Sequence, residues 1–412
     1  MTAKTLLPAV AMLLGATVMA TSALAQTAKD ESVLGRPRPD YSPIGIELGG
    51  GGFTLYPKLN LGALYDDNVF REESGQEADI AAIIQPEVEL RSDWDVHEAV
   101  LGASTTIARH RDEQRADFED YLAYLNSRLD VTDDSAISSH SEYARLHENR
   151  GDSNGTPRGR DTVQFQRLTQ RLGLELALSP AFLRVNGNVI RYAYNDQNGI
   201  NHDDRDRTDV EGRVRVGVEV SPRMALFVEP GANQRRYDTT DDFGLDRDSQ
   251  GWDVRGGVTY DLTGVTFLEL FGGYYHQDYE DVGLGSAEGF DMGAELIWNP
   301  TDVATVTGAV TRAVRETDVR GASGIVDTGV EAKVDYEILE NWLGHAHAAV
   351  HAEQFVDKHR TDNIEEVGVG TTYLINEYFS AGLDYAYGER NSDTAGEDYR
   401  FNRVFLRLMG AL

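Results

Sequence analysis

Residues 210–220 alternate strictly between two kinds of side chain. The even positions are valine or glycine, and the odd positions are glutamate, arginine or glycine. Because successive side chains of a strand point to opposite sides, one face of this segment suits hydrocarbon and the other suits water. A soluble sheet can alternate in the same way, so the choice of solvent depends on how long the strands are and how often the pattern recurs.

The alternation recurs roughly every forty residues, with two long segments in each period. We count about eighteen strands of roughly ten to fourteen residues, long enough to cross a bilayer when tilted and about twice the usual strand of a soluble sandwich. The first strand is expected over residues 53–65 and the closing strand over residues 399–410. One representative outward set is Phe290, Met292, Ala294, Leu296 and Trp298.

Short and long connections alternate between these segments. The short turns are expected at residues 92–95, 133–134, 179–180, 221–222, 262–264, 299–300, 340–341 and 376–377. Between each pair of these turns a longer polar segment is expected, for example at residues 148–161, 195–207, 238–250, 278–287, 316–324 and 391–397. An even number of strands then places both termini and all short turns on one side.

These features predict an all-β fold, a transmembrane antiparallel β-barrel of about eighteen strands with short periplasmic turns and long extracellular loops. The alternative is a soluble β-propeller, whose blades have a similar period. A blade packs four short strands into that length, whereas this chain has two long ones, which favours the barrel.

The chain divides into three parts. Residues 1–25 carry Lys4, an apolar run and Ala23-Leu24-Ala25, the pattern of a secretory signal peptide cleaved after Ala25. Residues 26–52 are proline-rich and are expected to form an extended periplasmic lead-in. Residues 53–412 are expected to form the transmembrane barrel.

Composition and charge narrow the function further. The 412 residues include 41 glycines, 11 prolines and no cysteine, which favours strands and turns and excludes disulfides, thiol chemistry and a cysteine zinc site. The formal charge is −31, and it becomes −32 when the signal peptide with its single charged residue, Lys4, is removed. Such acidity argues against nucleic acid or an anionic membrane surface as partners, because both require basic patches.

Three stretches carry a family resemblance. Residues 33–45 read Val-Leu-Gly-Arg-Pro-Arg-Pro-Asp-Tyr-Ser-Pro-Ile-Gly, residues 65–70 read Tyr-Asp-Asp-Asn-Val-Phe, and residues 92–97 read Ser-Asp-Trp-Asp-Val-His. With these motifs the chain resembles the putative beta-barrel porin 2 family of Gram-negative outer-membrane proteins over nearly the whole mature chain. The family has no catalytic signature to carry over. Some relatives are associated with exopolysaccharide export, so the resemblance permits a role in glycan passage.

The inward faces form the functional surface of such a barrel, since eighteen strands leave room for an aqueous lumen. A basic wall is expected from Arg167, Arg171, Arg184, Arg213, Arg215 and Arg255. An acidic wall is expected from Glu331, Asp335, Glu337, Glu353, Glu366 and Asp384. Two such walls would set a field across the pore and favour anions along the arginines. The alternative is that these residues form cross-strand ion pairs, such as Arg215 near Glu219 or its neighbours, and only keep the interior polar.

Two groups of residues suggest metal ligands. His345, His347, His351 and Glu353 share one parity on one strand, but residues strung along a strand do not converge on one ion, so lumen histidines are the favoured interpretation. The aspartates of residues 201–209 lack the glycine and distal glutamate of a calcium-binding loop and are interpreted as solvated surface. We therefore expect no metal, no cofactor and no catalytic residue.

The leading hypothesis is a non-enzymatic outer-membrane barrel that forms an aqueous channel, either porin-like or the outer conduit of an exopolysaccharide export system. The expected partners are outer-membrane lipid, the barrel-assembly machinery, and small solutes or polysaccharide. Two alternatives belong to other classes. One is an outer-membrane enzyme with catalytic groups on its extracellular loops, and the other is a plugged structural or adhesive barrel whose lumen is filled by the loops or by residues 26–50.

Overall fold

The computed structural model describes residues 31–50, 52–153, 161–197, 199–262 and 264–412. The expected signal peptide, residues 1–25, lies outside the described residues. The strands are β1 (Ile46–Leu48), β2 (Phe53–Asp66), β3 (Asp79–Ser92), β4 (Glu98–His110), β5 (Phe118–Thr132), β6 (Ser135–His147), β7 (Gln164–Leu178), β8 (Ala181–Tyr194), β9 (Arg207–Ser221), β10 (Met224–Tyr237), β11 (Ser249–Asp261), β12 (Thr266–Tyr279), β13 (Ala287–Thr301), β14 (Ala304–Arg315), β15 (Ile325–Leu339), β16 (Trp342–Phe355), β17 (Thr361–Leu374), β18 (Phe379–Ser392) and β19 (Tyr399–Ala411). Short 3-10 turns, η2 (Pro39–Tyr41), η3 (Gln114–Ala116) and η4 (Asp203–Arg205), lie in the connections.

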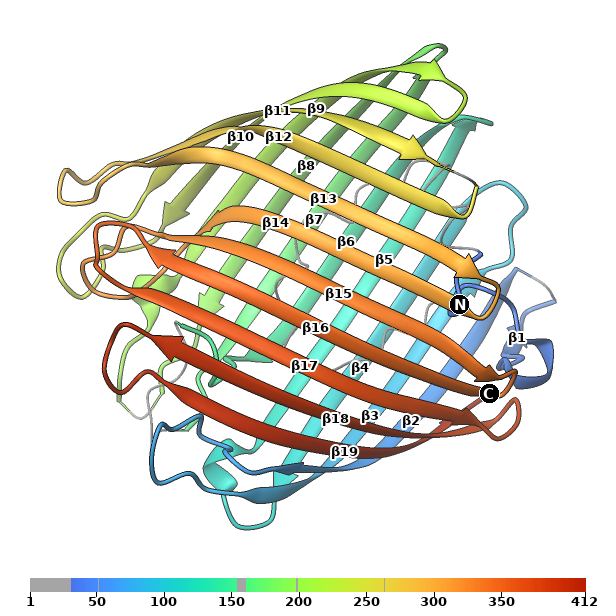
Figure 1. Ribbon diagram of the computed structural model, residues 1–412, viewed down its shortest axis with the longest axis horizontal. Coiled ribbons are helices and arrows are strands. Elements are labelled where there is room, and N and C mark those ends of the chain that lie inside the picture. The colour runs from blue at the N-terminus through green and yellow to red at the C-terminus, as the bar shows by residue number, and fades with distance from the viewer. Residues whose placement is uncertain (1–30, 51, 154–160, 198, 263) are drawn as a thin grey trace.

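Strands β2 to β19 form one closed sheet (Figure 1). Each strand pairs antiparallel with the next, and β19 returns to pair with β2, from Arg403 opposite Asp66 to Ala411 opposite Lys58. β1 pairs with the first residues of β2, beyond the point where β19 ends. The prediction of an eighteen-stranded antiparallel barrel is confirmed, and the first and last strands begin at the predicted residues.

The connections alternate in length as the sequence predicts, with one correction. The turn expected at residues 299–300 lies inside β13, which continues to Thr301. The register shifts between Trp298 and Thr301, so Pro300 sits in a bulge, where its missing N–H removes no ladder hydrogen bond. The chain reverses two residues later, between β13 and β14.

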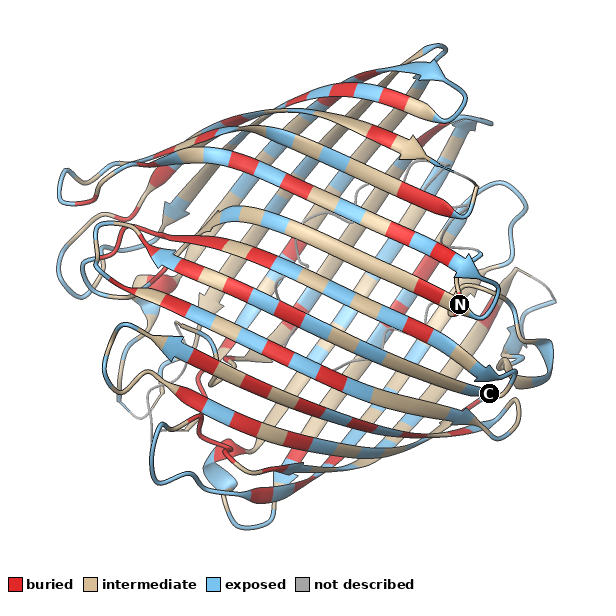
Figure 2. Cartoon of the chain, in the orientation of Figure 1, coloured by how far each residue is buried: buried red, intermediate tan, exposed pale blue. Residues whose placement is uncertain are grey.

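The two faces of the strands differ as the alternation predicts (Figure 2). On β9, Val210, Val214, Val216, Val218 and Val220 are exposed on the outside of the barrel. The outer face of β13 is similar, and Phe290 is 78% exposed. No helix among the described residues is long and apolar enough to cross a membrane.

Inward-facing aromatic rings lie flat across glycines of the neighbouring strand. Phe227 on β10 covers Gly257 on β11, and a Cβ atom at Gly257 would lie 2.4 Å from the ring and 2.5 Å from the carbonyl oxygen of Leu270. The guanidinium of Arg215 stacks on this ring, 3.8 Å from its centroid. The same arrangement recurs with Phe182 over Gly217 and Phe271 over Gly293. Glycine at these positions therefore makes room for the aromatic layer.

We predict that Gly257→Val destabilises the barrel, because the new side chain would meet both Phe227 and the backbone of β12. Overpacking of this kind costs about 1–3 kcal/mol of unfolding free energy. The matched control is Gly256→Val, since the Cβ position at Gly256 has only one atom within 4 Å. Urea unfolding followed by heat-modifiable gel migration measures the difference, and equal midpoints for the two variants would contradict the packing role.

Candidate functional site: the lumen of the barrel

All six arginines of the predicted basic wall lie on inward-facing positions of neighbouring strands. They are Arg167 and Arg171 on β7, Arg184 on β8, Arg213 and Arg215 on β9, and Arg255 on β11. The sheet register places Arg184 directly opposite Arg215. Two adjacent guanidinium groups repel each other unless anions lie between or beside them.

Carboxylates supply those anions. Arg215 Nε donates to Glu229 at 2.6 Å, and its two Nη atoms donate to Glu269 at 3.0 Å. Glu229 is 1% exposed, so this pair is shielded from bulk water. The suggested partner Glu219 is not the one used, because four residues along a strand span roughly 13 Å whereas cross-strand neighbours are adjacent.

Four of the other five arginines are paired in the same way. Arg213 Nη1 lies 2.7 Å from Asp253, and Arg255 makes a close contact with Asp291. Arg184 Nε lies 2.8 Å from Glu175. Arg167 Nη2 lies 2.9 Å from Glu142. The inner face of β6 to β13 is therefore a mixed lattice of both charge signs, which is the arrangement expected of cross-strand ion pairs.

The six carboxylates of the predicted acidic wall also lie on inward-facing positions. They are Glu331, Asp335 and Glu337 on β15, Glu353 on β16, Glu366 on β17 and Asp384 on β18. Lys333 Nζ lies 2.9 Å from Asp335, and Arg315 Nη2 lies 2.5 Å from Glu353. This face, too, has positively charged side chains beside its acids.

Histidines lie beside several other carboxylates of this face. His345 Nε2 lies 3.2 Å from Asp384, and His347 Nε2 lies 3.4 Å from Glu366. His351 Nδ1 lies 3.2 Å from Asp327. The three imidazoles thus face different carboxylates on different strands, so the histidines of β16 do not converge on a shared point.

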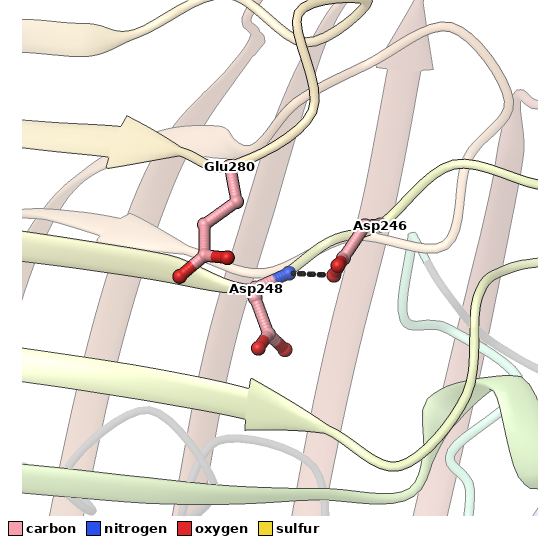
Figure 3. A group of neighbouring side chains, drawn as sticks. All are labelled: Asp246, Asp248 and Glu280. Carbon is pink, nitrogen blue, oxygen red and sulfur yellow. Dashed lines mark hydrogen bonds between the residues drawn. The ribbon is translucent and has the colours of Figure 1, made fainter.

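One acidic group among the described residues has the spacing of a cation site (Figure 3). Asp246, Asp248 and Glu280 bring one oxygen each within 4.8 Å of one another at the long-loop end. Arg236 Nη1, however, lies 2.6 Å from both Asp248 and Glu280. The guanidinium already supplies the positive charge that these carboxylates need. In the loop of residues 201–209, Asp206 instead accepts the backbone N–H of Tyr194 at 2.6 Å.

Residues 148–153, the described first part of the connection between β6 and β7, enter the lumen from the long-loop end. Ser153 makes a close hydrogen bond to Glu353 on β16, and the hydroxyl of Tyr399 on β19 donates to the carbonyl of Gly151 at 2.9 Å. Glu148 contacts Arg205 in the β8–β9 connection. Because β6 and β16 are eight strands apart by the shorter way around the closed sheet, residues 148–153 reach across the barrel.

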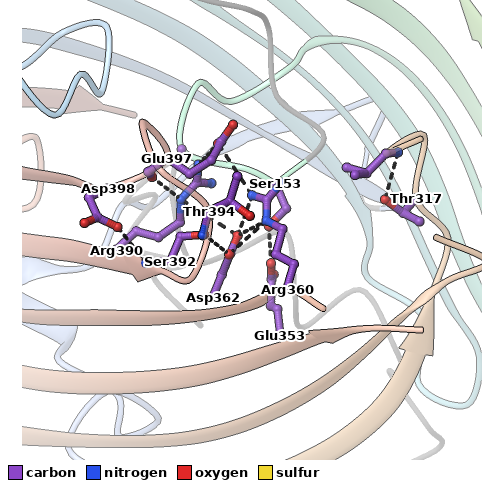
Figure 4. Close-up of polar contacts among 12 residues, drawn as sticks. Ser153, Thr317, Glu353, Arg360, Asp362, Arg390, Ser392, Thr394, Glu397 and Asp398 are labelled. Atoms are coloured by element: carbon purple, nitrogen blue, oxygen red, sulfur yellow. Dashed lines mark hydrogen bonds and ion pairs between the residues drawn. The ribbon is translucent and has the colours of Figure 1, made fainter. Parts of the chain in front are cut away.

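A buried polar network anchors the far side of this crossing (Figure 4). Asp362 is 0% exposed and accepts hydrogen bonds from Arg360 Nε at 2.9 Å and Ser392 Oγ at 2.5 Å. Arg390 Nη2 donates to Glu397 at 2.5 Å. Charged side chains that are this well shielded from water are unexpected at the mouth of a wide open barrel. The connections therefore pack together at this mouth.

The lead-in enters the opposite mouth. The backbone N–H of Val33 donates to Thr305 Oγ1 at 2.8 Å, and Val33 is 1% exposed. Arg38 Nη2 lies 2.6 Å from Glu337, one of the inward carboxylates of β15. Chain segments therefore narrow the lumen at both ends. The sequence predicts a lumen filled by the loops or by residues 26–50 only as an alternative. The polar composition of these segments is the same whether they project outward or fold inward.

A closed barrel with an apolar exterior and a charged interior defines a porin-like β-barrel protein. The sequence profile of the putative beta-barrel porin 2 family matches residues 38–411, and the chain belongs to that family. None of the curated proteins matches the sequence.

Several solved structures are similar to this chain. OccK3 (OpdO) of Pseudomonas aeruginosa is similar with a TM-score of 0.44 and 13% identity, over 87% of this chain and 96% of that one. OccK9 (OpdG) of the same organism is similar with a TM-score of 0.47 and 13% identity, over 87% and 98%. The FrpB iron transporter of Neisseria meningitidis is similar with a TM-score of 0.48 and 8% identity, over 89% and 82%.

We predict that the double substitution Arg213→Gln plus Arg215→Gln raises the preference of the lumen for cations. The change removes two positive charges, which leaves Glu269 without its arginine partner and leaves Glu229 and Asp253 with Arg255 as their remaining one. Reversal potentials in a salt gradient measure the permeability ratio, with Arg223→Gln, in the β9–β10 turn, as the control. An unchanged ratio in a folded double variant would show that these pairs do not set selectivity.

We predict that Asp152 contributes a pH-dependent charge to the narrowed part of the lumen. Asp152 is exposed to the lumen, but the surrounding protein reduces the hydration of its carboxylate. This desolvation raises the pKa of Asp152 to about 6, and the nearby Arg315 opposes the shift. A raised pKa means that the carboxylate is charged above pH 6 and neutral below it. Lowering the pH from about 7.5 to about 5 should therefore reduce cation preference.

Reversal potentials at the two pH values check this expectation. Asp152→Asn should show a lower cation preference at about pH 7.5 and a smaller change on acidification. Asp134→Asn, an exposed residue in the β5–β6 turn, is the control. A pH response that is identical in Asp152→Asn and the wild type would assign the titration to other groups.

Proposed function

We propose that the protein is an outer-membrane channel for small polar solutes and that it acts without catalysis. The observation that carries this proposal is the opposite character of the two faces of one closed sheet. Ion pairs cover the inner face, as described above, and apolar side chains cover the outer face. Exposed outward residues include Leu59, Leu61, Leu101, Leu168, Leu172, Val216, Val228, Phe290, Val330, Leu383 and Leu406.

The apolar exterior supports placement in a lipid bilayer. A band of exposed leucine, valine and phenylalanine around a closed barrel would be costly in water, and a bilayer removes that cost. Closure also leaves no sheet edge whose backbone groups would need water. The expected signal peptide and the family both favour the outer membrane, with outer-membrane lipid and the barrel-assembly machinery as partners.

The narrowed lumen favours small solutes over a polymer. Residues 148–153 cross the barrel at one end and the lead-in enters at the other. A polysaccharide chain would have to displace both segments. The conduit role stays a prediction from the family resemblance, and genes for glycosyltransferases beside this one would support it.

The long loops favour a channel over an enzyme. In their described parts, serine hydroxyls donate to carboxylates, as in Ser153 to Glu353, Ser323 to Asp357 and Ser392 to Asp362. A serine nucleophile instead requires a neighbouring general base such as histidine. These serines therefore suit the packing of the loops.

We predict ion-conducting channels when the purified protein is added to planar bilayers. Ser153→Ala plus Tyr399→Phe should increase the unit conductance, because it removes two hydrogen bonds that hold residues 148–153 across the lumen. The matched control is Tyr387→Phe, which removes a hydroxyl that bonds within its own strand, to Glu389. The absence of channels would contradict the proposed function. Unchanged conductance in the double variant would contradict only the idea that residues 148–153 narrow the lumen.

A further inference from the structure

A cavity lies inside the barrel, against β2, β3, β4, β18 and β19 and beneath the β6–β7 connection. Its lining includes Glu148, Asn149, Arg150 and Thr162 of that connection. The strands and the inward-folded segment together enclose it. The described residues of the β6–β7 connection therefore form one side of this cavity.

One wall of this cavity is apolar, which is unusual for the inner face of a water-filled barrel. Leu64, Ile83, Phe118 and Phe405 pack around the fully buried Ala81 and Ala108. The sheet register places Phe405 opposite Leu64 and Ile83 opposite Ala108, so these side chains form one continuous surface. A ligand that fills the cavity would bury an apolar body against this surface.

A buried arginine borders the apolar wall. Arg403 lies two residues before Phe405 on β19 and is 8% exposed. Its Nε and Nη2 atoms have no hydrogen-bond acceptor among the described residues, and its ion-pair neighbour Glu366 is 3.7 Å away. Burying a guanidinium costs free energy unless an acceptor satisfies it. Arg403 is thus the group of the cavity that most needs an anion.

The carboxylates of the cavity have other partners. Asp66 pairs with Arg71, whose Nη1 and Nη2 lie 2.9 and 2.7 Å from its two oxygens. Asp79 accepts the backbone N–H groups of Ile80, Asp112 and Glu113.

Of the remaining two carboxylates, Glu148 is engaged outside the cavity, whereas neither oxygen of Asp384 receives a hydrogen bond among the described residues, and its neighbours are ion-pair contacts only. Glu148 contacts Arg205, and Asp384 lies 3.2 Å from His345 and 3.7 Å from Arg407. These contacts leave Arg403 available to a ligand.

A second cation lines the cavity from the β6–β7 connection. Arg150 stacks 4.7 Å from the centroid of the Phe70 ring, and its Nη2 donates to the carbonyl of Arg115 at 3.1 Å. Burial and the nearby Arg115 lower the pKa of Arg150 to about 10, so it stays charged at neutral pH. Its charge adds to that of Arg403 in favouring an anion.

We propose that this cavity binds a small amphipathic carboxylate, with the carboxylate on Arg403 and the apolar body on Leu64, Ile83 and Phe405. Guanidinium groups match carboxylates in both charge and planar geometry. For this reason we propose a carboxylate as the anionic group of the ligand. Binding at this site goes beyond the proposed channel function. Passage of the same solutes through the lumen rests on that function.

Calorimetric titration of the detergent-solubilised, full-length protein tests the site. The probes are 3-phenylpropanoate, the uncharged 3-phenylpropanamide, and propanoate, which lacks the ring. We expect 3-phenylpropanoate to bind at least about tenfold more tightly than either of the others, because only it uses both the charge and the apolar wall.

Two variants separate the site from general effects. Arg403→Gln should weaken 3-phenylpropanoate binding at least about tenfold and leave the amide unchanged. Gln85→Glu, an isosteric change on the cavity wall that adds a negative charge, should weaken the carboxylate in a barrel that keeps Arg403. Arg407→Gln is the matched control, an inward arginine four residues along β19 whose Nη2 donates to Thr372 at 3.2 Å. Heat-modifiable migration verifies folding of each variant.

Three results would overturn the proposal. The first is equal affinity for 3-phenylpropanoate and 3-phenylpropanamide, and the second is no binding of 3-phenylpropanoate to the wild type. The third is 3-phenylpropanoate binding that is weakened by Arg407→Gln but not by Arg403→Gln. Conductance of the same preparation keeps the two hypotheses distinct. Channels without selective carboxylate binding would contradict the binding site and support the channel function. Carboxylate binding without channels would support the binding site and contradict the channel function.

Discussion

The pairing of β19 with β2 is the contact on which the rest of the structure depends. It closes the sheet, so the backbone N–H and C=O groups of every barrel strand find partners on both sides. Closure also separates an inside from an outside. Only then do the two parities of each strand meet different surroundings, with Val216 exposed outside and Arg215 buried inside.

The inner face is built from repeated units of three residues. A glycine makes room for an aromatic ring of the neighbouring strand, and an arginine stacks on that ring while pairing with carboxylates, as with Gly257, Phe227 and Arg215. The unit keeps a long charged side chain close to the wall. It also explains why so many charges on the inner face coexist without one sign dominating a region.

The segments that enter the lumen divide this polar interior into regions of different chemical character. Residues 148–153 divide the space, and the part enclosed against β2, β3 and β19 contains both an apolar wall and a buried arginine. The lead-in narrows the other mouth through Arg38 and Glu337. A channel of this kind would offer a small solute a sequence of distinct surroundings along its path.

Period-two alternation by itself determined the strands, their number, their inward and outward faces, and the two kinds of connection, because parity is a local property of an extended chain. It also placed each of the twelve charged candidates on the inward face. It did not determine their partners: Arg215 meets Glu229 and Glu269, and His345 meets Asp384, only through register between strands. The inward fold of residues 148–153 and the cavity beside Arg403 were decided by the tertiary structure alone, since a polar connection has the same composition whether it folds into water inside the barrel or outside it.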